Sequence, residues 1–165
     1  MNQLEKFKEI NTFIFDVDGV LTDSSVLILE DGKLLRKMSV KDGYAIKKAI
    51  NKGYHFCIIT GGKSEGVKLR LQGLGVTDIY LGQHEKLDAF ESFIYAYDID
   101  PSKAIYMGDD IPDIAVMEKV GLPCCPSNAV AEVLAVSEYV SPFQGGEGCA
   151  RDVIEKVLKL RGDWS

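Results

Sequence analysis

Residues 13–23 read FIFDVDGVLTD, and this stretch decides the fold. The stretch begins within an apolar, β-prone run over 12–15. Two carboxylates, Asp16 and Asp18, follow this run. Gly19 then lets the backbone turn sharply. A short apolar run that ends in Asp-x-Asp-Gly predicts a buried parallel strand leading into a loop. Because ligands of open α/β sheets bind at the carboxyl ends of such strands, the stretch also predicts the place of a site.

The carboxylates of Asp16 and Asp18 have two interpretations. Two nearby carboxylates repel each other unless a cation or a shared proton relieves the repulsion. A bound Mg²⁺ is the simplest relief, because hard oxygen ligands suit it. Alternatively, the pair belongs to an ordinary turn and is solvated. This stretch alone leaves both interpretations open.

Composition narrows the class of protein. The 165 residues predict one domain spanning 1–165, and hydrophobic and charged contents of 46% and 27% are ordinary for a globular protein. A net charge of −6 argues against nucleic acid or an anionic membrane as partner, but not against a phosphorylated substrate. No apolar run reaches membrane-spanning length, and residues 1–11 lack a signal-peptide core. The four cysteines show neither disulfide nor zinc spacing, so we expect a cytoplasmic protein.

A hairpin is predicted over 25–38. Its arms flank the dipeptide Asp31-Gly32, which is a strong signal for a tight turn. The first arm, 26–29, reads VLIL and is apolar on both faces. We therefore expect the hairpin to form a flap that packs against something, such as another subunit.

The rest of the chain alternates apolar runs with amphipathic segments. Strands are predicted over 55–59, 78–81, 104–107, 121–125 and 138–140. Helices are predicted over 42–52, 64–74, 85–97, 112–119, 129–135 and 149–160. This alternation predicts an α/β fold with a doubly wound, mostly parallel, Rossmann-like sheet and right-handed crossovers.

Four predicted strand ends carry side chains that can take part in catalysis. In chain order they are Asp16 with Asp18, Thr60 with Gly61 and Gly62, Lys86, and Asp109 with Asp110 and Asp113. A parallel sheet brings these ends to one edge. Carboxylates can hold Mg²⁺, a hydroxyl and glycine backbone can donate to phosphate oxygens, and a lysine can neutralise phosphate charge. The set predicts phosphoryl transfer.

Each group also has a plainer interpretation when taken alone. Thr60 can belong to a simple turn, and Lys86 can be a solvated lysine at a helix start. The spacing from Asp109 to Asp113 is more specific, because it is one helical turn beginning at a strand end. All four groups in this order, each at a strand end, favour a catalytic site.

The order of these motifs resembles the haloacid dehalogenase superfamily of aspartate-nucleophile phosphatases. A closer resemblance is to the 3-deoxy-D-manno-octulosonate 8-phosphate phosphatase family, and it covers nearly the whole chain. It is carried by FDVDGVLTD at 15–23, SVKDGYAIKKA at 39–49, IITGG at 58–62, GQHEKLDAF at 82–90, IYMGDDIPD at 105–113 and GGEGCARDVIE at 145–155.

The resemblance implies a role for each strand-end residue. Asp16 would attack phosphorus and become an aspartyl phosphate. Asp18 would protonate the leaving sugar alkoxide and then deprotonate the hydrolytic water. Asp16, the Asp18 carbonyl and Asp109 would bind Mg²⁺, while Thr60 and Lys86 would hold the phosphoryl group.

The resemblance also implies a substrate site. Besides Asp18, Thr60 and Lys86, the implied substrate-binding residues are Lys41, Asp42, Gly43, Lys47, Gly61 and Arg70. Many members of the family carry a charged residue where Gly62 stands, so one contact to the sugar acid is expected to be missing here. The implied substrate is 3-deoxy-D-manno-octulosonate 8-phosphate, and a nine-carbon sugar acid 9-phosphate is the alternative.

The motif spacing leaves no room for a cap domain. One hairpin, one helix and one strand fill the interval from Asp16 to Thr60, and a helix with a short strand fills the interval from there to Lys86. Phosphoryl transfer must still be shielded from bulk water. Neighbouring subunits could do this with the hairpin and the C-terminal tail, and the resembled family is tetrameric, which implies a homotetramer.

Arg151 is then either a surface arginine or a contact to a neighbour's sugar acid, and Trp164 is expected to anchor packing.

Two non-enzymatic functions compete with this prediction. A response-regulator receiver domain also places acidic residues, Thr and Lys around Mg²⁺ on a doubly wound sheet. Its lysine ends the last strand and its acidic pair is adjacent, whereas here Asp109 follows Lys86 and the pair is spaced by one residue. A catalytically quiet interaction module is disfavoured because no catalytic position is missing.

Overall fold

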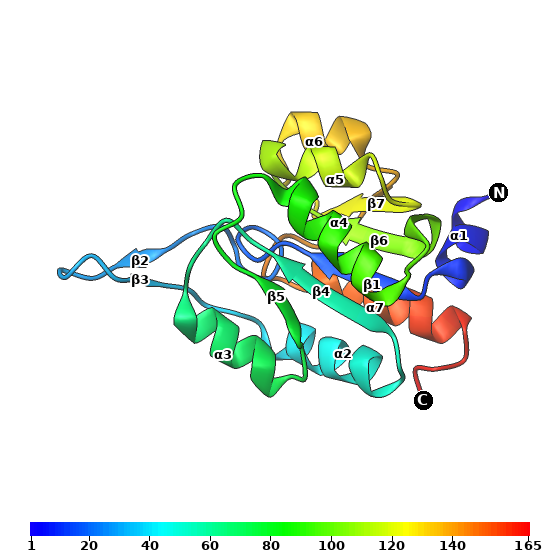
Figure 1. The fold of residues 1–165 in the computed structure, drawn as a ribbon, viewed down its shortest axis with the longest axis horizontal. Helices are drawn as coiled ribbons and strands as arrows, with labels where there is room; N and C mark the ends of the chain where they lie inside the picture. Colours follow the sequence, from blue (N-terminus) through cyan, green and yellow to red (C-terminus); the bar gives the residue numbers. More distant parts are fainter.

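Six parallel strands form the central sheet in the computed structural model, which describes residues 1–165 (Figure 1). They are β1 (Thr12–Phe15), β4 (His55–Ile59), β5 (Asp78–Tyr80), β6 (Ala104–Met107), β7 (Leu122–Cys125) and β8 (Tyr139–Val140). Their order across the sheet is β5-β4-β1-β6-β7-β8, and every neighbouring pair is parallel.

The strand order reverses beside β1. From β1 the chain moves outward to β4 and β5, and then returns to β6 on the other side of β1. At such a switch point the loops after the two central strands diverge and leave a crevice at the carboxyl end of the sheet. The doubly wound, mostly parallel sheet predicted from the sequence is confirmed.

Seven α-helices connect and cover the strands. They are α1 (Gln3–Glu9), α2 (Val40–Asn51), α3 (Glu65–Gly73), α4 (Lys86–Tyr97), α5 (Ile114–Met117), α6 (Ala131–Val136) and α7 (Cys149–Leu160). Two short 3-10 helices, η1 (Pro101–Lys103) and η2 (Ile111–Asp113), flank β6. None of the helices has the length and apolar character that crossing a membrane requires.

Each face of the sheet has its own hydrophobic core. Helices α1, α2, α3 and α7 cover one face, and α4, α5 and α6 cover the other (Figure 1). The side chains of β1 alternate between the two: Phe13 and Phe15 enter the first core, and Ile14 enters the second. Because both faces are covered, β1 is apolar at every position except Thr12, which is why the sequence showed a continuous run rather than an alternation.

The predicted hairpin forms and extends from the body of the protein. Strands β2 (Leu27–Ile28) and β3 (Leu34–Leu35) pair antiparallel and are shorter than the predicted arms. Gly32 has a φ of +87°, which the tight turn requires. The hairpin leaves the carboxyl end of the sheet, whereas both chain termini lie at the opposite end (Figure 1). No cap domain interrupts the chain.

Two local elements differ from the sequence-based prediction. Helix α1 was not predicted, because it buries only Phe7 and therefore lacks a periodic apolar signal; a capping box between Asn2 and Glu5 starts it. The helix predicted over 112–119 is divided into η2 and α5. The side chain of Asp113 accepts hydrogen bonds from the backbone preceding η2, which tightens this turn.

Candidate active site

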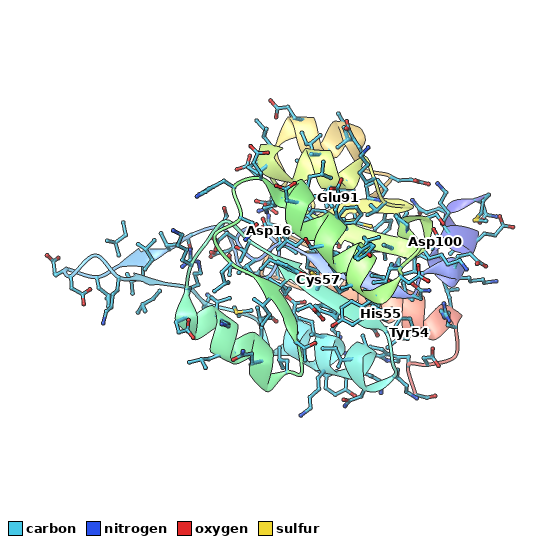
Figure 2. All side chains as sticks on the ribbon, in the orientation of Figure 1. Asp16, Tyr54, His55, Cys57, Glu91 and Asp100 are labelled. Atoms are coloured by element: carbon cyan, nitrogen blue, oxygen red, sulfur yellow. The ribbon has the colours of Figure 1, made fainter.

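The predicted catalytic residues meet in one cavity at the carboxyl end of the sheet. The cavity has a volume of about 320 Å³ and no hydrophobic lining residue. Its lining includes Asp16, Asp18, Thr60, Gly61, Lys86 and Asp109. Figure 2 shows Asp16 at this end of the sheet and His55 at the far end of β4, away from the site. The topology therefore brings together the four strand ends that the sequence singled out.

Asp16 is the first residue after β1 and is buried. Its backbone N–H donates to the Met107 carbonyl at 3.1 Å, and its Oδ1 accepts from the Val17 N–H at 2.7 Å. The Lys86 ammonium lies 3.1 Å from the same oxygen. Burial and the Asp113 carboxylate raise the pKa of Asp16, and Lys86 opposes them. Asp16 is thus a desolvated carboxylate held at a fixed position.

Lys86 begins α4, and its side chain is buried. Its Nζ lies 2.7 Å from Oδ1 of Asp113 in addition to its contact with Asp16. Burial alone would lower the pKa of Lys86, but the two carboxylates outweigh burial and raise it, so the ammonium stays charged. The interpretation of Lys86 as a solvated helix-start lysine is wrong, because its side chain is buried between two carboxylates at the carboxyl end of the sheet.

Asp113 organises this half of the cavity. It is fully buried and accepts from Lys86, from the Tyr106 hydroxyl, and from the backbone N–H groups of Asp109 at 3.0 Å and Asp110 at 3.2 Å. The sequence alone did not indicate a role for Asp113. These contacts make it the residue that holds Lys86 and the loop after β6 in place.

The acidic groups fit a hard cation. Oxygens of Asp16, Asp109 and Asp113 lie within 4.8 Å of one another. Oδ1 of Asp109 is buried without a hydrogen-bond partner, and burial together with the Asp113 and Asp110 carboxylates raises the pKa of Asp109 to about 7. Because Asp113 already accepts from several donors, Asp16 and Asp109 are the side chains that could hold Mg²⁺.

Gly19 allows the loop after β1 to approach Asp109. Its φ is +87°, and a Cβ at this position would overlap the Asp109 carboxylate. The glycine of the Asp-x-Asp-Gly motif therefore serves both the turn and the close contact between the two acidic loops.

Thr60 and the two glycines after it form a turn that lines the cavity. Thr60 is buried; its N–H donates to the Tyr80 carbonyl at 2.9 Å, and its Oγ1 accepts from the Gly62 N–H at 3.2 Å. Gly61 lines the same cavity. The turn and the site are thus one structure, and the two interpretations from the sequence do not exclude each other.

Asp18 makes an ion pair that the sequence analysis missed. The guanidinium of Arg36, just after β3, donates from Nε to Oδ1 of Asp18 at 2.7 Å and from Nη2 to Oδ2 at 3.1 Å. No local pattern marks Arg36, because the contact joins the hairpin to the loop after β1. The only signal in the sequence is that Arg36, a positively charged residue, lies near the end of the predicted hairpin.

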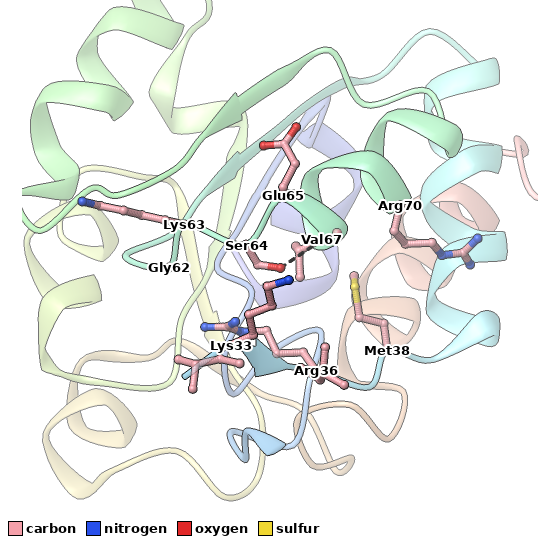
Figure 3. Close-up of a pocket in the computed structure, with 12 residues that line it drawn as sticks. Lys33, Arg36, Met38, Gly62, Lys63, Ser64, Glu65, Val67 and Arg70 are labelled. Atoms are coloured by element: carbon pink, nitrogen blue, oxygen red, sulfur yellow. Dashed lines mark hydrogen bonds between the residues drawn. The ribbon is translucent and has the colours of Figure 1, made fainter. Parts of the chain in front are cut away.

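A larger cavity of about 840 Å³ lies beside the first, between the hairpin and the start of α3 (Figure 3). Gly62 lines both cavities. The charged residues around the larger cavity are Lys33, Arg36, Lys63 and Arg70, with Glu65 as the one acid. An anionic ligand is therefore favoured there.

The family resemblance implied a set of substrate-binding residues, and only some of them line a cavity in the structure. Arg70 lines the larger cavity, whereas Lys41, Gly43 and Lys47 on α2 line neither cavity. Lys41 and Lys47 are exposed, and Gly43 is buried against Arg70, where a Cβ would lie 2.7 Å from Nη2. Within one chain, Gly43 makes room for Arg70, and contacts of Lys41 and Lys47 with substrate stay a prediction.

Asp42 and Arg151 face each other away from both cavities. Asp42 is buried and accepts from the Arg151 backbone N–H at 3.1 Å, and thus caps α7. The Arg151 side chain pairs with Glu155 and lies over the Trp164 ring, which meets Tyr44 edge-on. Trp164 is a packing anchor, as predicted, and within the chain Arg151 is a packed surface arginine.

Fold and site together define a class of protein. A buried aspartate after the central strand, a second acid two residues on, and a threonine, a lysine and an acidic loop at neighbouring strand ends are the arrangement of a haloacid dehalogenase-like hydrolase. The model of that family matches residues 72–151.

The relatives are more specific. The 3-deoxy-D-manno-octulosonate 8-phosphate phosphatase of Escherichia coli (strain K12) is 37% identical over 159 residues, covering 96% of this chain and 85% of the relative. The crystal structure of that phosphatase from Yersinia pestis has a TM-score of 0.94 and 32% identity, covering 97% and 86% of the two chains. The Moraxella catarrhalis enzyme, in complex with magnesium ion, phosphate ion and KDO, has a TM-score of 0.93 and 32% identity, covering 98% and 92%. This chain belongs to the 3-deoxy-D-manno-octulosonate 8-phosphate phosphatase family.

Proposed function

We propose that this protein is a Mg²⁺-dependent phosphatase that hydrolyses 3-deoxy-D-manno-octulosonate 8-phosphate to the free sugar acid and phosphate. The observation that carries the proposal is the buried Asp16 carboxylate, held 3.1 Å from the Lys86 ammonium at the switch point of the sheet. A desolvated carboxylate beside a fixed cation suits attack on an anionic phosphoryl group, because the cation offsets the charge of the substrate.

In the first half-reaction Asp16 is the nucleophile. Its carboxylate oxygen forms a bond to phosphorus while the ester P–O bond breaks, and the electron pair of that bond leaves on the sugar oxygen. Asp18 gives its carboxyl proton to this oxygen, so the sugar departs as a neutral alcohol. Thr60 and the Gly61 backbone donate to the phosphoryl oxygens, and Lys86 neutralises their charge.

In the second half-reaction Asp18 acts as the base. It takes a proton from a water molecule as the water oxygen bonds to phosphorus, and the acyl phosphate bond to Asp16 breaks. Inorganic phosphate leaves, and Asp16 is again a carboxylate. When bound, Mg²⁺ would neutralise phosphoryl charge, held by Asp16, Asp109 and the Asp18 carbonyl.

The surroundings of the site support a sugar acid as the leaving group. Four cations from outside the catalytic cavity, Lys33, Arg36, Lys63 and Arg70, line the adjacent larger cavity. A substrate with its phosphate in the first cavity and its sugar in the second would place a carboxylate among these charges. The Moraxella catarrhalis relative was crystallised with KDO, the same kind of sugar acid.

Assembly and location are part of the proposal. The hairpin exposes Leu27 by 63% and Ile28 by 68%, and covering them with identical hairpins would close a homotetramer and shield the site from water. All four cysteines are free and buried, which suits the reducing cytoplasm. The negative net charge disfavours nucleic acid as a partner.

A phosphate-release screen tests the proposal. The panel contains 3-deoxy-D-manno-octulosonate 8-phosphate, a nine-carbon sugar acid 9-phosphate and neutral sugar phosphates, each with Mg²⁺ and with EDTA. We expect the octulosonate ester to have the highest kcat/KM and to require Mg²⁺. A higher kcat/KM for the nine-carbon or a neutral ester would reject the proposed substrate, and full activity in EDTA would reject the metal.

A further inference from the structure

The Arg36–Asp18 ion pair forms part of the wall between the two cavities. Asp18 lines the catalytic cavity and Arg36 lines the larger one, while Gly62 borders both. The side chain of Arg36 is only 8% exposed, so its charge is largely removed from water. A substrate that spans both cavities must therefore pass directly beside this pair.

The geometry of the pair conflicts with the first task of Asp18. Both of its carboxylate oxygens accept from the guanidinium, at 2.7 and 3.1 Å. The bidentate guanidinium therefore occupies both oxygens of the Asp18 carboxylate. Asp18 can contact the leaving sugar oxygen only through a free carboxyl oxygen, so Arg36 must release at least one oxygen before the ester bond breaks.

A guanidinium with little access to water needs another acceptor when it leaves a carboxylate. The other charged side chains of the larger cavity offer almost none, because they are cations except for Glu65. Figure 3 shows Glu65 pointing away from Arg36. A carboxylate on the substrate matches the planar fork of the guanidinium and would enter from the cavity that Arg36 already lines.

We propose that Arg36 is a latch on Asp18 that the carboxylate of the sugar acid opens. The guanidinium holds Asp18 in the free enzyme and turns to the substrate carboxylate when the larger cavity fills. Asp18 is then free to contact the leaving sugar oxygen. This inference rests on the proposed function and adds a positioning residue, Arg36, that makes turnover of poor leaving groups depend on a substrate carboxylate.

Gly62 gives the latch its space. A Cβ at Gly62 would lie 3.1 Å from Nη2 of Arg36 and 3.5 Å from Oδ2 of Asp18. Any longer side chain there would compete with the guanidinium for the same volume. The absence of a side chain at Gly62 thus leaves room for the Arg36 guanidinium beside Asp18.

The test compares Arg36→Gln with wild type on two esters of a primary alcohol: 3-deoxy-D-manno-octulosonate 8-phosphate and a neutral pentose 5-phosphate. We expect kcat/KM for the sugar acid ester to fall roughly tenfold to hundredfold, as for loss of a charge-assisted pair. We expect kcat for the neutral ester to rise, because Asp18 is no longer held.

Lys37→Gln is the matched control, since it removes the same charge from the next, exposed residue and leaves the ratio of the two activities unchanged. Arg36→Lys, which keeps the charge without the fork, should be intermediate. Calorimetry with the free sugar acid supplies a second readout: Arg36→Gln should weaken its binding and leave binding of inorganic phosphate unchanged.

A parallel fall on both esters in a folded Arg36→Gln protein, or no change on either, would overturn the latch. Unchanged binding of the sugar acid would overturn it as well. Failure of the proposed function is seen separately, because it appears in wild type alone as a preference for the neutral ester.

Discussion

Asp42 gives a sharp prediction about stability. Helix α7 begins after Gly148, which has no side chain to cap it. Asp42, on the first turn of α2, caps α7 instead through its Oδ1, while its Oδ2 is buried without a partner. Asp42 is only 2% exposed, and this burial raises its pKa from 3.8 to about 6.

The sign and size of the effect follow from this pKa. The folded protein binds the Asp42 proton more tightly than the unfolded chain, so the stabilisation is complete below pH 3.8 and is lost as the pH rises through about 6. The difference between a pKa of 3.8 in the unfolded chain and about 6 in the folded protein corresponds to about 3 kcal/mol at alkaline pH. Asparagine stays neutral and keeps an acceptor for the Arg151 N–H, and the attraction of that N–H for the charged carboxylate is already contained in the net pKa.

We therefore expect Asp42→Asn to be more stable than wild type by about 3 kcal/mol near pH 8, with the gain nearly absent near pH 4. Urea unfolding followed by circular dichroism at both pH values measures it. Asp88→Asn, which removes a charge from the exposed first turn of α4, is the control and should lack this pH-dependent gain. A difference between Asp42→Asn and wild type that is equal at the two pH values would refute the assigned burial cost.

Three further predictions concern the site and the assembly. Asp16→Asn should abolish turnover while circular dichroism shows that the fold stays intact; retention of more than a few per cent of kcat would exclude Asp16 as nucleophile. Asp109→Ala should raise the Mg²⁺ concentration needed for phosphate release, or abolish release; an unchanged Mg²⁺ titration curve would count against Asp109 as a ligand. Leu27→Asp should dissociate the oligomer in sedimentation and lower kcat/KM for the sugar acid phosphate more than for a small generic ester; an active wild-type monomer would contradict the shared site.

The sheet could be predicted because its strands are buried on both faces. Such strands appear as continuous apolar runs, and polar residues or glycines mark their ends, so β1, β4 and β6 were placed with their observed bounds. Helix α7 was also placed correctly, because its inner face repeats regularly along three turns. Helix α1 gave no such signal, since one buried Phe7 makes no periodic pattern.

Part of the site could be predicted for the same reason. Asp16, Thr60, Lys86 and Asp109 follow strands whose parallel order fixes where their ends lie. The contact of Arg36 with Asp18 and the cap that Asp42 forms on α7 depend instead on how separate segments pack. No spacing along the chain encodes those two contacts, and the resemblance to a family suggested a different role for Asp42.

The hairpin connects assembly with the latch. Only two residue pairs join β2 and β3, and an isolated two-stranded hairpin is marginally stable in water. Arg36 follows β3 directly, so the position of its guanidinium depends on what holds Leu34 and Leu35, which are exposed by 43% and 48%. If identical hairpins of neighbouring subunits cover these leucines, each subunit helps to fix the position of Arg36 in its neighbours. Dissociation by Leu27→Asp should then loosen Arg36 from Asp18 and shift the ratio of acidic to neutral ester turnover in the same direction as Arg36→Gln.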